Sequence, residues 1–326
     1  MNVIHCSKEG GHYLFYLSSI AKHYPEPLCW SLTENHIREI KALREGFNDI
    51  FLLCDREICY ENISVRRVIY LENSINYIMK STRFPSRYIA YNFGEKWIEK
   101  VLYEWFYLLL KAKKNTEKLF LLGGQRLYLS SKKQVFLPDP VPESSFDGRN
   151  EERMTRLVIL LIGSISKRKG VNFVLNLAKR LEHDKRFQFR IVGQFSNDCN
   201  DVLEQFSNYP NVLVDNRWLN EEDFHVEVRN SNALILPYSR LNTSSGILGY
   251  GCLYRKPVIT FQRGAHIPRL VEKYNLGTFI SEKSLDLEED FDRLFVNYLQ
   301  IVDSMKSIEY IKDNSIKKFV KTILDE

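Results

Sequence analysis

The sequence has no run of about 18 consecutive apolar residues, the length that an α-helix needs to cross a bilayer. Its first residues, MNVIHCSKEGGH, lack the cationic segment followed by an apolar core that marks a secretory signal peptide. We therefore expect a cytoplasmic protein without a membrane-spanning helix, although one that can still lie at the inner face of the membrane.

Cysteine pairs with the spacing of a zinc or redox motif are also missing. The six cysteines stand at positions 6, 29, 54, 59, 199 and 252, and no two form a CxxC. Buried, reduced thiols are the simplest interpretation of such a set. No Asp-x-Asp follows a predicted strand either, so we expect neither a metal site nor a bound cofactor.

A strong excess of basic charge is absent as well. The net charge is +5, with 21 lysines and arginines against 17 acidic residues up to residue 150, and 25 against 24 beyond it. Nucleic-acid binding usually requires a higher and more clustered positive charge, so we expect no nucleic-acid partner. A mild basic bias suits an anionic small molecule or an anionic membrane surface.

The second half of the sequence alternates apolar strands with amphipathic helices. The continuous apolar run LVILLIG (Leu157–Gly163) is typical of a strand that is buried on both faces. Strands separated by helices at this spacing predict a parallel, doubly wound α/β sheet. Further strands are predicted at Phe187–Gly193, Val212–Val214, Ala233–Pro237, Val258–Phe261 and Thr278–Ile280, and helices at Gly170–Leu181, Val202–Phe206, Glu221–Arg229, Leu287–Lys306 and Ile308–Leu324.

The first half carries a weaker version of the same pattern. A segment rich in Pro, Ser, Gly, Asp and Asn, Pro138–Asn150, is the best linker in the chain. We therefore predict two domains, residues 1–150 and 151–326, with the last helices able to cross back to the first domain. The first domain is predicted to hold strands at Asn2–His5, Ile50–Cys54, Val68–Leu71, Tyr88–Tyr91, Lys118–Leu121 and Gln134–Leu137, and helices at Tyr13–His23 and Lys96–Lys113.

The most informative segment runs from Ala233 to Ile280, where an apolar strand is followed by a polar Ser/Gly-rich loop and the start of a helix. Backbone N–H groups at a helix start are unpaired, and the helix dipole favours an anion there. Ligands of doubly wound sheets also bind at the carboxyl ends of the strands, and two such domains suggest a cleft between them. This loop therefore predicts a phosphate site.

Several short segments, in this order and spacing, resemble the donor-binding domain of family 4 glycosyltransferases. They are GSISKRKG (163–170), FRIVG (189–193), NVLVDNRWLNEEDF (211–224), ALILPYS (233–239) and GCLYRKPVIT (251–260). The resemblance implies the GT-B fold, which has two Rossmann-like domains with parallel sheets facing across a cleft. It also implies a nucleotide-sugar donor, UDP- or GDP-linked, and a retaining, metal-independent transfer.

Lys169 is the first site residue that the resemblance implies, because the family places a lysine before the helix-opening glycine against the donor diphosphate. A cation beside a helix start is an anion site on physical grounds too. The family usually has an arginine at the position of Ser164, and Lys167, Arg168 or Arg240 are candidates to replace that charge. The alternative is a solvated basic turn.

The family also has two glutamates eight positions apart in the loop after the strand ALIL. Here these positions hold Asn242 and Tyr250. An asparagine amide can still hydrogen-bond a sugar, but a tyrosine is a poor substitute for a ribose-binding carboxylate. The backbone N–H groups of the loop are left as a diphosphate cradle; they belong to Thr243, Ser244, Ser245, Gly246 and Ile247.

Other candidates lie at strand ends. Gln194 and Trp218 follow strands where the family seats the nucleotide base, with plain packing as the alternative for Trp218. His266 precedes the helix that closes the donor site in the family, or is a surface histidine. In the first domain the turn Gly10-Gly11-His12 follows the first strand and is predicted to lie near the transferred sugar or the acceptor. We thus assign catalytic roles to Lys169, Asn242 and His12. Donor binding is assigned to Gly10, Gly11, Ser164, Lys167, Arg168, Gln194, Trp218, Arg240, Thr243, Ser244, Ser245, Gly246, Ile247 and Tyr250.

We expect a glycosyltransferase that moves a sugar to a hydroxyl of a glycan or lipid-linked acceptor, in surface polysaccharide biosynthesis. The aromatic helix Trp97–Lys111 is either a peripheral membrane-facing patch for such an acceptor or a core helix. The missing acidic pair leaves open a non-catalytic partner subunit or glycan-binding protein of a glycosyltransferase complex. A sugar-nucleotide epimerase is a third possibility, although the acidic and histidine cluster that it needs is not apparent.

Overall fold

The computed structural model describes residues 1–9, 12–54, 63–71, 84–90, 108–109, 112, 114–122, 133–144, 155–238, 245–262, 266–281 and 287–324. The chain forms two compact units. The first comprises Met1–Asp139 together with Asn314–Glu326, and the second comprises Pro140–Asp313. The boundary therefore falls at Asp139/Pro140, about ten residues before the predicted one, inside the proline-rich segment.

The first unit is built on a seven-stranded sheet in the order β3-β2-β1-β4-β5-β6-β7, and every neighbouring pair is parallel. The order reverses between β1 and β4, as in a doubly wound sheet. Its strands are β1 (Asn2–Cys6), β2 (Leu28–Leu32), β3 (Ile50–Leu53), β4 (Arg67–Tyr70), β5 (Ser86–Ala90), β6 (Thr116–Leu122) and β7 (Gln134–Leu137).

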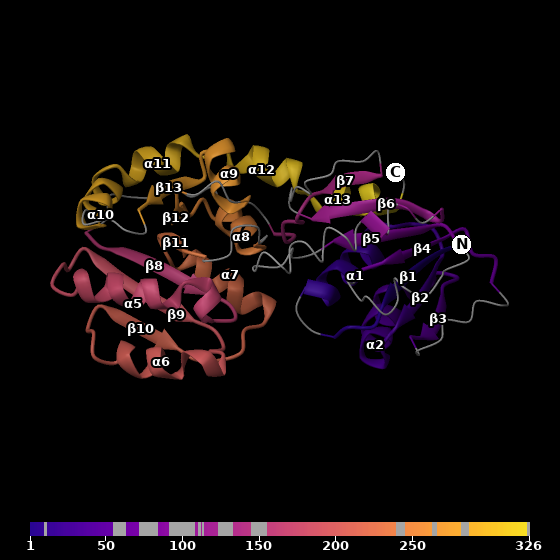
Figure 1. Cartoon of the computed structure of the whole chain (residues 1–326), viewed down its shortest axis with the longest axis horizontal. Helices are drawn as coiled ribbons and strands as arrows, with labels where there is room; N and C mark the ends of the chain where they lie inside the picture. Colours follow the sequence, from indigo (N-terminus) through magenta and orange to yellow (C-terminus); the bar gives the residue numbers. More distant parts are fainter. Residues whose placement is uncertain are drawn as a thin grey trace. The chain divides into compact units, whose positions relative to one another are not determined.

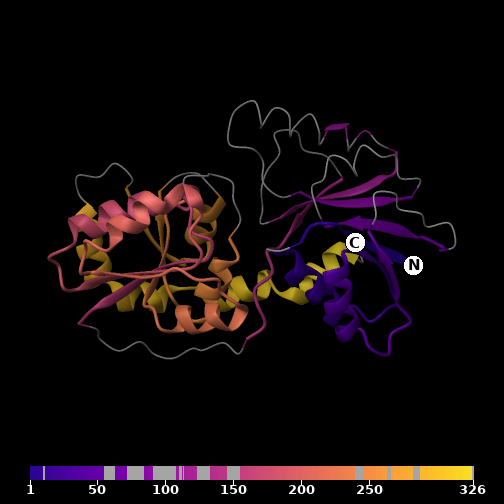
Figure 2. The ribbon, with the colours of Figure 1, turned by 90° about the horizontal axis from the view of Figure 1, so that it is seen from below.

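One face of this sheet is covered by α1 (His12–His23), α2 (Glu34–Leu43) and α13 (Ile316–Leu324). The apolar face of α13, with Phe319 and Ile323 fully buried, packs into the same core as α1. Figure 2 shows this C-terminal helix, in yellow, beside the indigo helices of the first unit. The last helix of the chain thus completes the core of the first unit.

Two arginines fix the end of α13 to the sheet. Arg87 donates a hydrogen bond of 2.6 Å to the carbonyl of Ile323, and Arg67 donates one of 3.2 Å to that of Leu324. Glu117 on β6 accepts from both arginines and balances part of their charge. Cations at a helix C-terminus also interact favourably with the helix dipole.

The second unit contains a six-stranded parallel sheet in the order β10-β9-β8-β11-β12-β13 (Figure 1). This is the order of a dinucleotide-binding fold, and it reverses between β8 and β11. The prediction of a parallel, doubly wound sheet is confirmed. Its strands are β8 (Leu157–Ile162), β9 (Phe187–Val192), β10 (Val212–Asp215), β11 (Ala233–Leu236), β12 (Val258–Phe261) and β13 (Gly277–Ile280).

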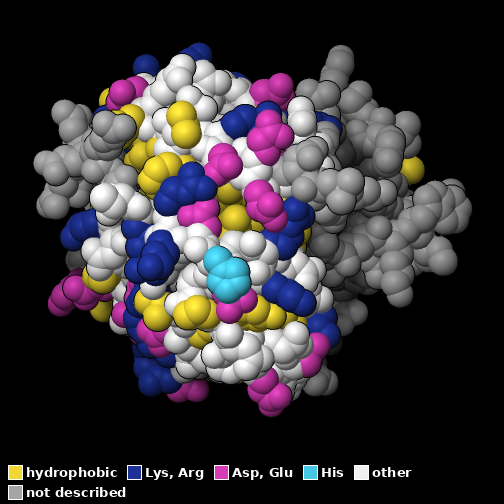
Figure 3. Space-filling model, turned by 90° about the vertical axis from the view of Figure 1, so that its left-hand side faces the viewer, with side chains coloured by type: hydrophobic (Ala, Val, Ile, Leu, Met, Phe, Trp, Pro, Cys, Tyr) yellow, Lys and Arg dark blue, Asp and Glu magenta, His cyan; other side chains and the backbone are white. Residues whose placement is uncertain are grey.

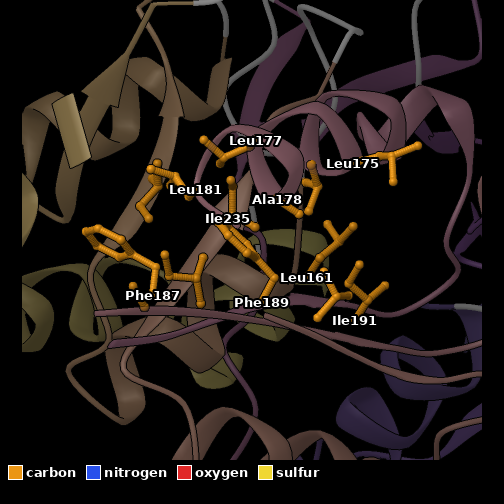
Figure 4. Packing of buried hydrophobic residues seen from close by; sticks show 14 of the residues in the cluster. Leu161, Leu175, Leu177, Ala178, Leu181, Phe187, Phe189, Ile191 and Ile235 are labelled. Atoms are coloured by element: carbon orange, nitrogen blue, oxygen red, sulfur yellow. The ribbon is translucent and has the colours of Figure 1, made fainter. Parts of the chain in front are cut away.

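Helices cover both faces of this sheet because alternate strand residues point to opposite sides. Leu157, Ile159 and Leu161 pack against α5 (Val171–Arg180), α6 (Asn200–Phe206), α10 (Leu287–Val296) and α11 (Tyr298–Ser304). Leu160 and Ile162 pack with α7 (Glu221–Arg229), α8 (Ile247–Leu253), α9 (His266–Lys273) and α12 (Ser307–Asp313). Figure 4 shows the first of these cores, where Phe187, Phe189 and Ile235 meet Leu177 and Ala178 of α5.

The C-terminal region differs from the prediction. Instead of two long helices it forms four, α10 to α13, with breaks at Asn297, Met305 and Asn314-Ser315. Most of the predicted helix 96–113 lies outside the described residues, and Leu108, Leu109 and Ala112 are helical. The choice between a membrane-facing patch and a core helix at 97–111 therefore rests mostly on residues outside the described part of the chain and stays open.

No helix among the described residues is both long and apolar enough to cross a bilayer. Figure 3 shows one face of the second unit, on which lysine and arginine side chains are interspersed with aspartate and glutamate. The five cysteines that the structure describes are free thiols. Four of these, Cys6, Cys29, Cys199 and Cys252, are buried, as predicted for structural thiols.

Candidate functional site

The candidate site lies at the carboxyl edge of the second unit's sheet, where the strand order reverses between β8 and β11. Helices leave opposite faces of the sheet at this point, so the loops diverge and leave room for a ligand. The loop after β8 contains Gly163 to Gly170, and the loop after β11 begins with Pro237. Most of the donor-site residues predicted from the sequence fall on these two loops.

Glycines hold the loop after β8 close to the ends of β11 and β9. Gly170 has a φ of 77°, in the left-handed region, and a Cβ there would collide with the carbonyl oxygen of Pro237. Gly193 at the end of β9 has a φ of 137°, and a Cβ there would collide with the carbonyl of Gly163. Only glycine fits both the backbone conformation and the space at these positions.

Lys169 lies on the 3-10 helix η1 (Lys167–Lys169) and turns its amine back toward β8. Nζ donates a hydrogen bond of 3.4 Å to the carbonyl of Ile162 and lies 5.9 Å from the centre of the Tyr238 ring. A Cβ on Gly163 would stand 2.9 Å from Nζ, with Phe224 and Ile247 also close. The amine is therefore seated at the switch point and is not a solvated turn residue.

The electrostatic state of Lys169 follows from this position. Burial lowers its pKa to about 8 from the usual 10.5, and the neighbouring Arg168 lowers it further. Within the described ranges no carboxylate forms an ion pair with its amine. A half-buried cation without a fixed counter-charge is a good partner for an anion that arrives from solution.

The loop between β11 and α8 is pinned at both ends. The hydroxyl groups of Tyr238 and Ser245 lie 3.1 Å apart in a hydrogen bond, across the start and end of the loop. Gly246 and Ile247 then open α8, and Ile247 reaches toward Gly163. Arg240, Asn242, Thr243 and Ser244 lie outside the described residues, so their predicted roles stay predictions.

Tyr250 packs against α7. Its ring stacks on Phe224 at 5.4 Å and meets His225 edge-on at 5.0 Å, both on α7. Burial raises the pKa of its hydroxyl, so the group stays neutral at ordinary pH. The position where the resemblance implies a ribose-binding carboxylate is occupied by a ring that packs α8 against α7.

The loops after β8 and β9 run side by side. Ile165 donates a backbone hydrogen bond of 2.8 Å to Gln194, and Ser196 donates one of 2.9 Å back to Ile165. Ser164 and Gln194 are both exposed at this edge. The exposed Lys167 lies 3.5 Å from Asp201, and Arg168 is half-buried beside Lys169.

Trp218 stands on the loop after β10 with 72% of its surface exposed, which does not fit a packing role. The loop itself is rigid, since Arg217 pairs with Asp215 at 2.9 Å and with Asp223 at 2.8 Å. Asn220 and Asp223 cap the start of α7 reciprocally. An exposed indole on a fixed loop is a suitable surface for a planar ligand group.

His266 is the first residue of α9, and it is buried, which corrects the surface position left open in the sequence analysis. In the first unit, His12 opens α1 directly after the predicted Gly-Gly turn. Gly10, Gly11 and the His12 side chain lie outside what the structure describes. Among the described residues, no group of three or more His, Cys, Asp or Glu side chains is arranged to hold a metal ion.

Sequence reasoning did not single out Tyr238 or Phe224, although both lie beside Lys169 or Gly163. Tyr238 follows the strand ALIL and a proline. A position directly after this strand is expected at the switch point, so the sequence carries a signal for Tyr238. Phe224 lies on α7, which packs on the same face of the sheet as α8. No local sequence pattern indicates that its ring lies near Gly163.

Two Rossmann-like units with parallel sheets define the GT-B fold, and the chain has this fold. No family model matches the sequence, and no curated protein sequence matches it. Among solved structures, it is similar to WaaG, a glycosyltransferase involved in lipopolysaccharide biosynthesis, with a TM-score of 0.64 and 14% identity over 100% of both chains.

It is also similar to HepE of Anabaena in complex with UDP and glucose, with a TM-score of 0.64 and 11% identity over 99% of this chain and 96% of that one. A UDP-GlcNAc 2-epimerase from Neisseria meningitidis, bound to UDP-GlcNAc, has a TM-score of 0.62 and 13% identity over 100% of this chain and 99% of that one. At these identities the likeness establishes the fold, and the activity has to be argued from the site.

Proposed function

We propose that the protein is a glycosyltransferase that transfers a sugar from a nucleotide-sugar donor to a hydroxyl group of an acceptor. The observation that carries the proposal is the half-buried amine of Lys169 at the reversal of the strand order. No carboxylate among the described residues neutralises it, and Gly170 holds its loop against the end of β11. A diphosphate is the ligand group whose charge and size match this arrangement.

Each residue of the site has a defined task in this proposal. Lys169, with Lys167 and Arg168 on the same turn, binds the diphosphate and stabilises the charge that develops on it as the sugar leaves. The exposed indole of Trp218 and the neighbouring Gln194 lie at the strand ends where the nucleoside extends. Ser164, Ser245, Gly246 and Ile247 offer backbone N–H groups to the phosphates.

The finer features of the reaction are part of the same proposal. Transfer is metal-independent, because the cations named above supply the charge that a metal ion would otherwise supply. It proceeds with retention, and a donor phosphate oxygen helps to deprotonate the acceptor hydroxyl. Asn242 is assigned to the hydroxyls of the transferred sugar, and Gly10, Gly11 and His12 are assigned to binding of the sugar or acceptor.

The acceptor is proposed to be a glycan or a lipid-linked oligosaccharide in surface polysaccharide biosynthesis. WaaG, which shares the fold, is described as involved in lipopolysaccharide biosynthesis. The mild basic bias of residues 1–150 is consistent with work at an anionic membrane surface. The protein would act at the inner face of the membrane as a peripheral enzyme.

Titration calorimetry with UDP, GDP and their glucose and mannose conjugates tests the proposal. The wild-type protein should bind one nucleotide series, and Lys169→Ala should lower that affinity by about ten- to one-hundred-fold, the value of a charge-assisted hydrogen bond. Incubation of the bound donor should then release free sugar slowly. Unchanged binding in the Lys169→Ala variant would refute the assignment of the phosphate site.

A second candidate, a non-catalytic partner subunit or glycan-binding protein of a glycosyltransferase complex, is favoured by one observation. Tyr250 packs against Phe224 and His225 where the resemblance implies an acidic residue. Absence of nucleotide binding at millimolar concentration, together with binding of an oligosaccharide, would favour this candidate.

A further inference from the structure

A buried histidine at the start of α9 has no role in the phosphate site described above. His266 is only 6% exposed. Its Nε2 atom has no hydrogen-bond partner among the described residues. Leaving a buried polar nitrogen unpaired lowers the stability of a fold. A ligand that binds at this position can supply the missing partner.

The fold places this histidine beside the proposed donor site. β11 and β12 are neighbours in the sheet, and the helices that follow them, α8 and α9, pack on the same face. Adjacent parallel strands lie about 4.8 Å apart, and the carboxyl ends of parallel strands share one edge of the sheet. The start of α9 therefore lies at the same carboxyl edge of the sheet as the start of α8, one strand away from the switch point, where the Ile247 side chain lies near Gly163.

The chemistry of the imidazole selects the ligand group. Burial and the nearby Arg269 lower the pKa of His266 to about 4, so the ring is neutral near pH 7. A neutral imidazole carries one donor and one acceptor nitrogen and suits a hydroxyl group, which can also donate and accept. A phosphate would instead call for a cation, and Lys169 already meets that need.

We propose that Nε2 of His266 hydrogen-bonds a hydroxyl of the sugar moiety of the donor and so helps to determine which sugar is accepted. The inference rests on the proposed function, because it requires a nucleotide-sugar at the switch point. Protein atoms enclose Nε2 in this structure, so the contact forms with a small local opening at the start of α9 when the ligand binds.

Paired calorimetric titrations separate the sugar from the nucleotide. UDP and UDP-glucose, or GDP and GDP-mannose, are titrated into wild type, His266→Phe and His266→Gln. The phenylalanine variant should keep the affinity for the free nucleotide and lose roughly threefold to tenfold for the nucleotide-sugar. The glutamine variant, whose amide also donates and accepts, should recover most of that loss.

His36→Phe is the matched control, since His36 is also buried, at 4% exposure, and also has one ring nitrogen unpaired, on α2 of the first unit. It should leave both affinities unchanged. The melting temperature of each variant checks the fold, and His266→Phe should melt no lower than wild type because it removes an unpaired polar atom.

The outcomes separate the two claims. An equal change for nucleotide and nucleotide-sugar in His266→Phe, or no change in either, overturns the role of His266 and leaves the proposed function standing. Failure of the wild type to bind any of the four ligands overturns both.

Discussion

Lys169 should lower the stability of the protein while it serves the ligand. Its pKa of about 8 lies below the 10.5 of an exposed lysine, so the unfolded chain binds more protons than the folded one between these values. The resulting loss of stability is complete below pH 8 and fades as the pH rises toward 10.5. The shift sets an upper limit of about 3.4 kcal/mol, and partial exposure reduces the expected value to about 1–2 kcal/mol.

Replacement of Lys169 by methionine, which keeps the length and removes the charge, should therefore raise the free energy of unfolding at pH 7 by about 1–2 kcal/mol. The same substitution should weaken nucleotide diphosphate binding by about 1.5–3 kcal/mol, the worth of a charge-assisted hydrogen bond. In the wild type, the charged fraction of the amine falls from about nine-tenths at pH 7 to about one-tenth at pH 9. Affinity should then fall about tenfold, and Lys169→Met should lose this dependence.

Urea unfolding at pH 7 and 10, and calorimetry with the bound nucleotide at pH 7, 8 and 9, measure these effects. Lys179→Met is the control, because Lys179 is exposed near the other end of α5. It should change neither quantity by more than about 0.5 kcal/mol. A Lys169→Met variant that is less stable than wild type at pH 7, or that binds nucleotide with wild-type affinity, would refute the reasoning.

Three further substitutions test other parts of the structure. Gly170→Ala should lower the free energy of unfolding, measured in urea, by about 2–4 kcal/mol, because the backbone there is left-handed and a Cβ would collide with the Pro237 carbonyl. A smaller loss would contradict that geometry. Trp218→Ala should leave stability within about 0.5 kcal/mol and weaken nucleotide binding by about 1–3 kcal/mol, measured by calorimetry; unchanged binding would remove the indole from the site. Arg87→Leu should lower the free energy of unfolding by about 2–4 kcal/mol by releasing the end of α13, and Lys118→Leu on the neighbouring strand is its control.

The sequence predicted the second unit well because its strands are short apolar runs between polar turns. Burial on both faces leaves little ambiguity in a run such as LVILLIG. The first unit was predicted less completely. β2 and α2 were not identified, because LCWSL is short and follows two prolines, and the exposed residues of α2 mask its single buried face. The prediction joins α10 and α11 into one helix because no local signal marks the break at Asn297, on either side of which a helix contacts β13.

The sequence predicts which residues of the candidate site follow strand ends, but not the orientation or burial of side chains that depends on helix packing. Lys169 was found because its position relative to a strand and a glycine is a local pattern. The orientation of Tyr250 was not predictable, since it depends on how α8 meets α7 and not on the sequence of α8. Burial of His266 depends in the same way on the packing of α9, which brings residues far apart in the chain together.

The return of the chain to the first unit has a consequence for biosynthesis. The core beneath β1, β4 and β6 is closed by Phe319, Val320 and Ile323, more than 170 residues after the first unit is otherwise finished at Asp139. On the ribosome, the second unit can therefore complete its fold first, while the nascent first unit still exposes an apolar face. Chaperone demand during translation should last until Ile316–Leu324 have emerged, and nascent chains stalled before that point should aggregate more readily than those stalled after it.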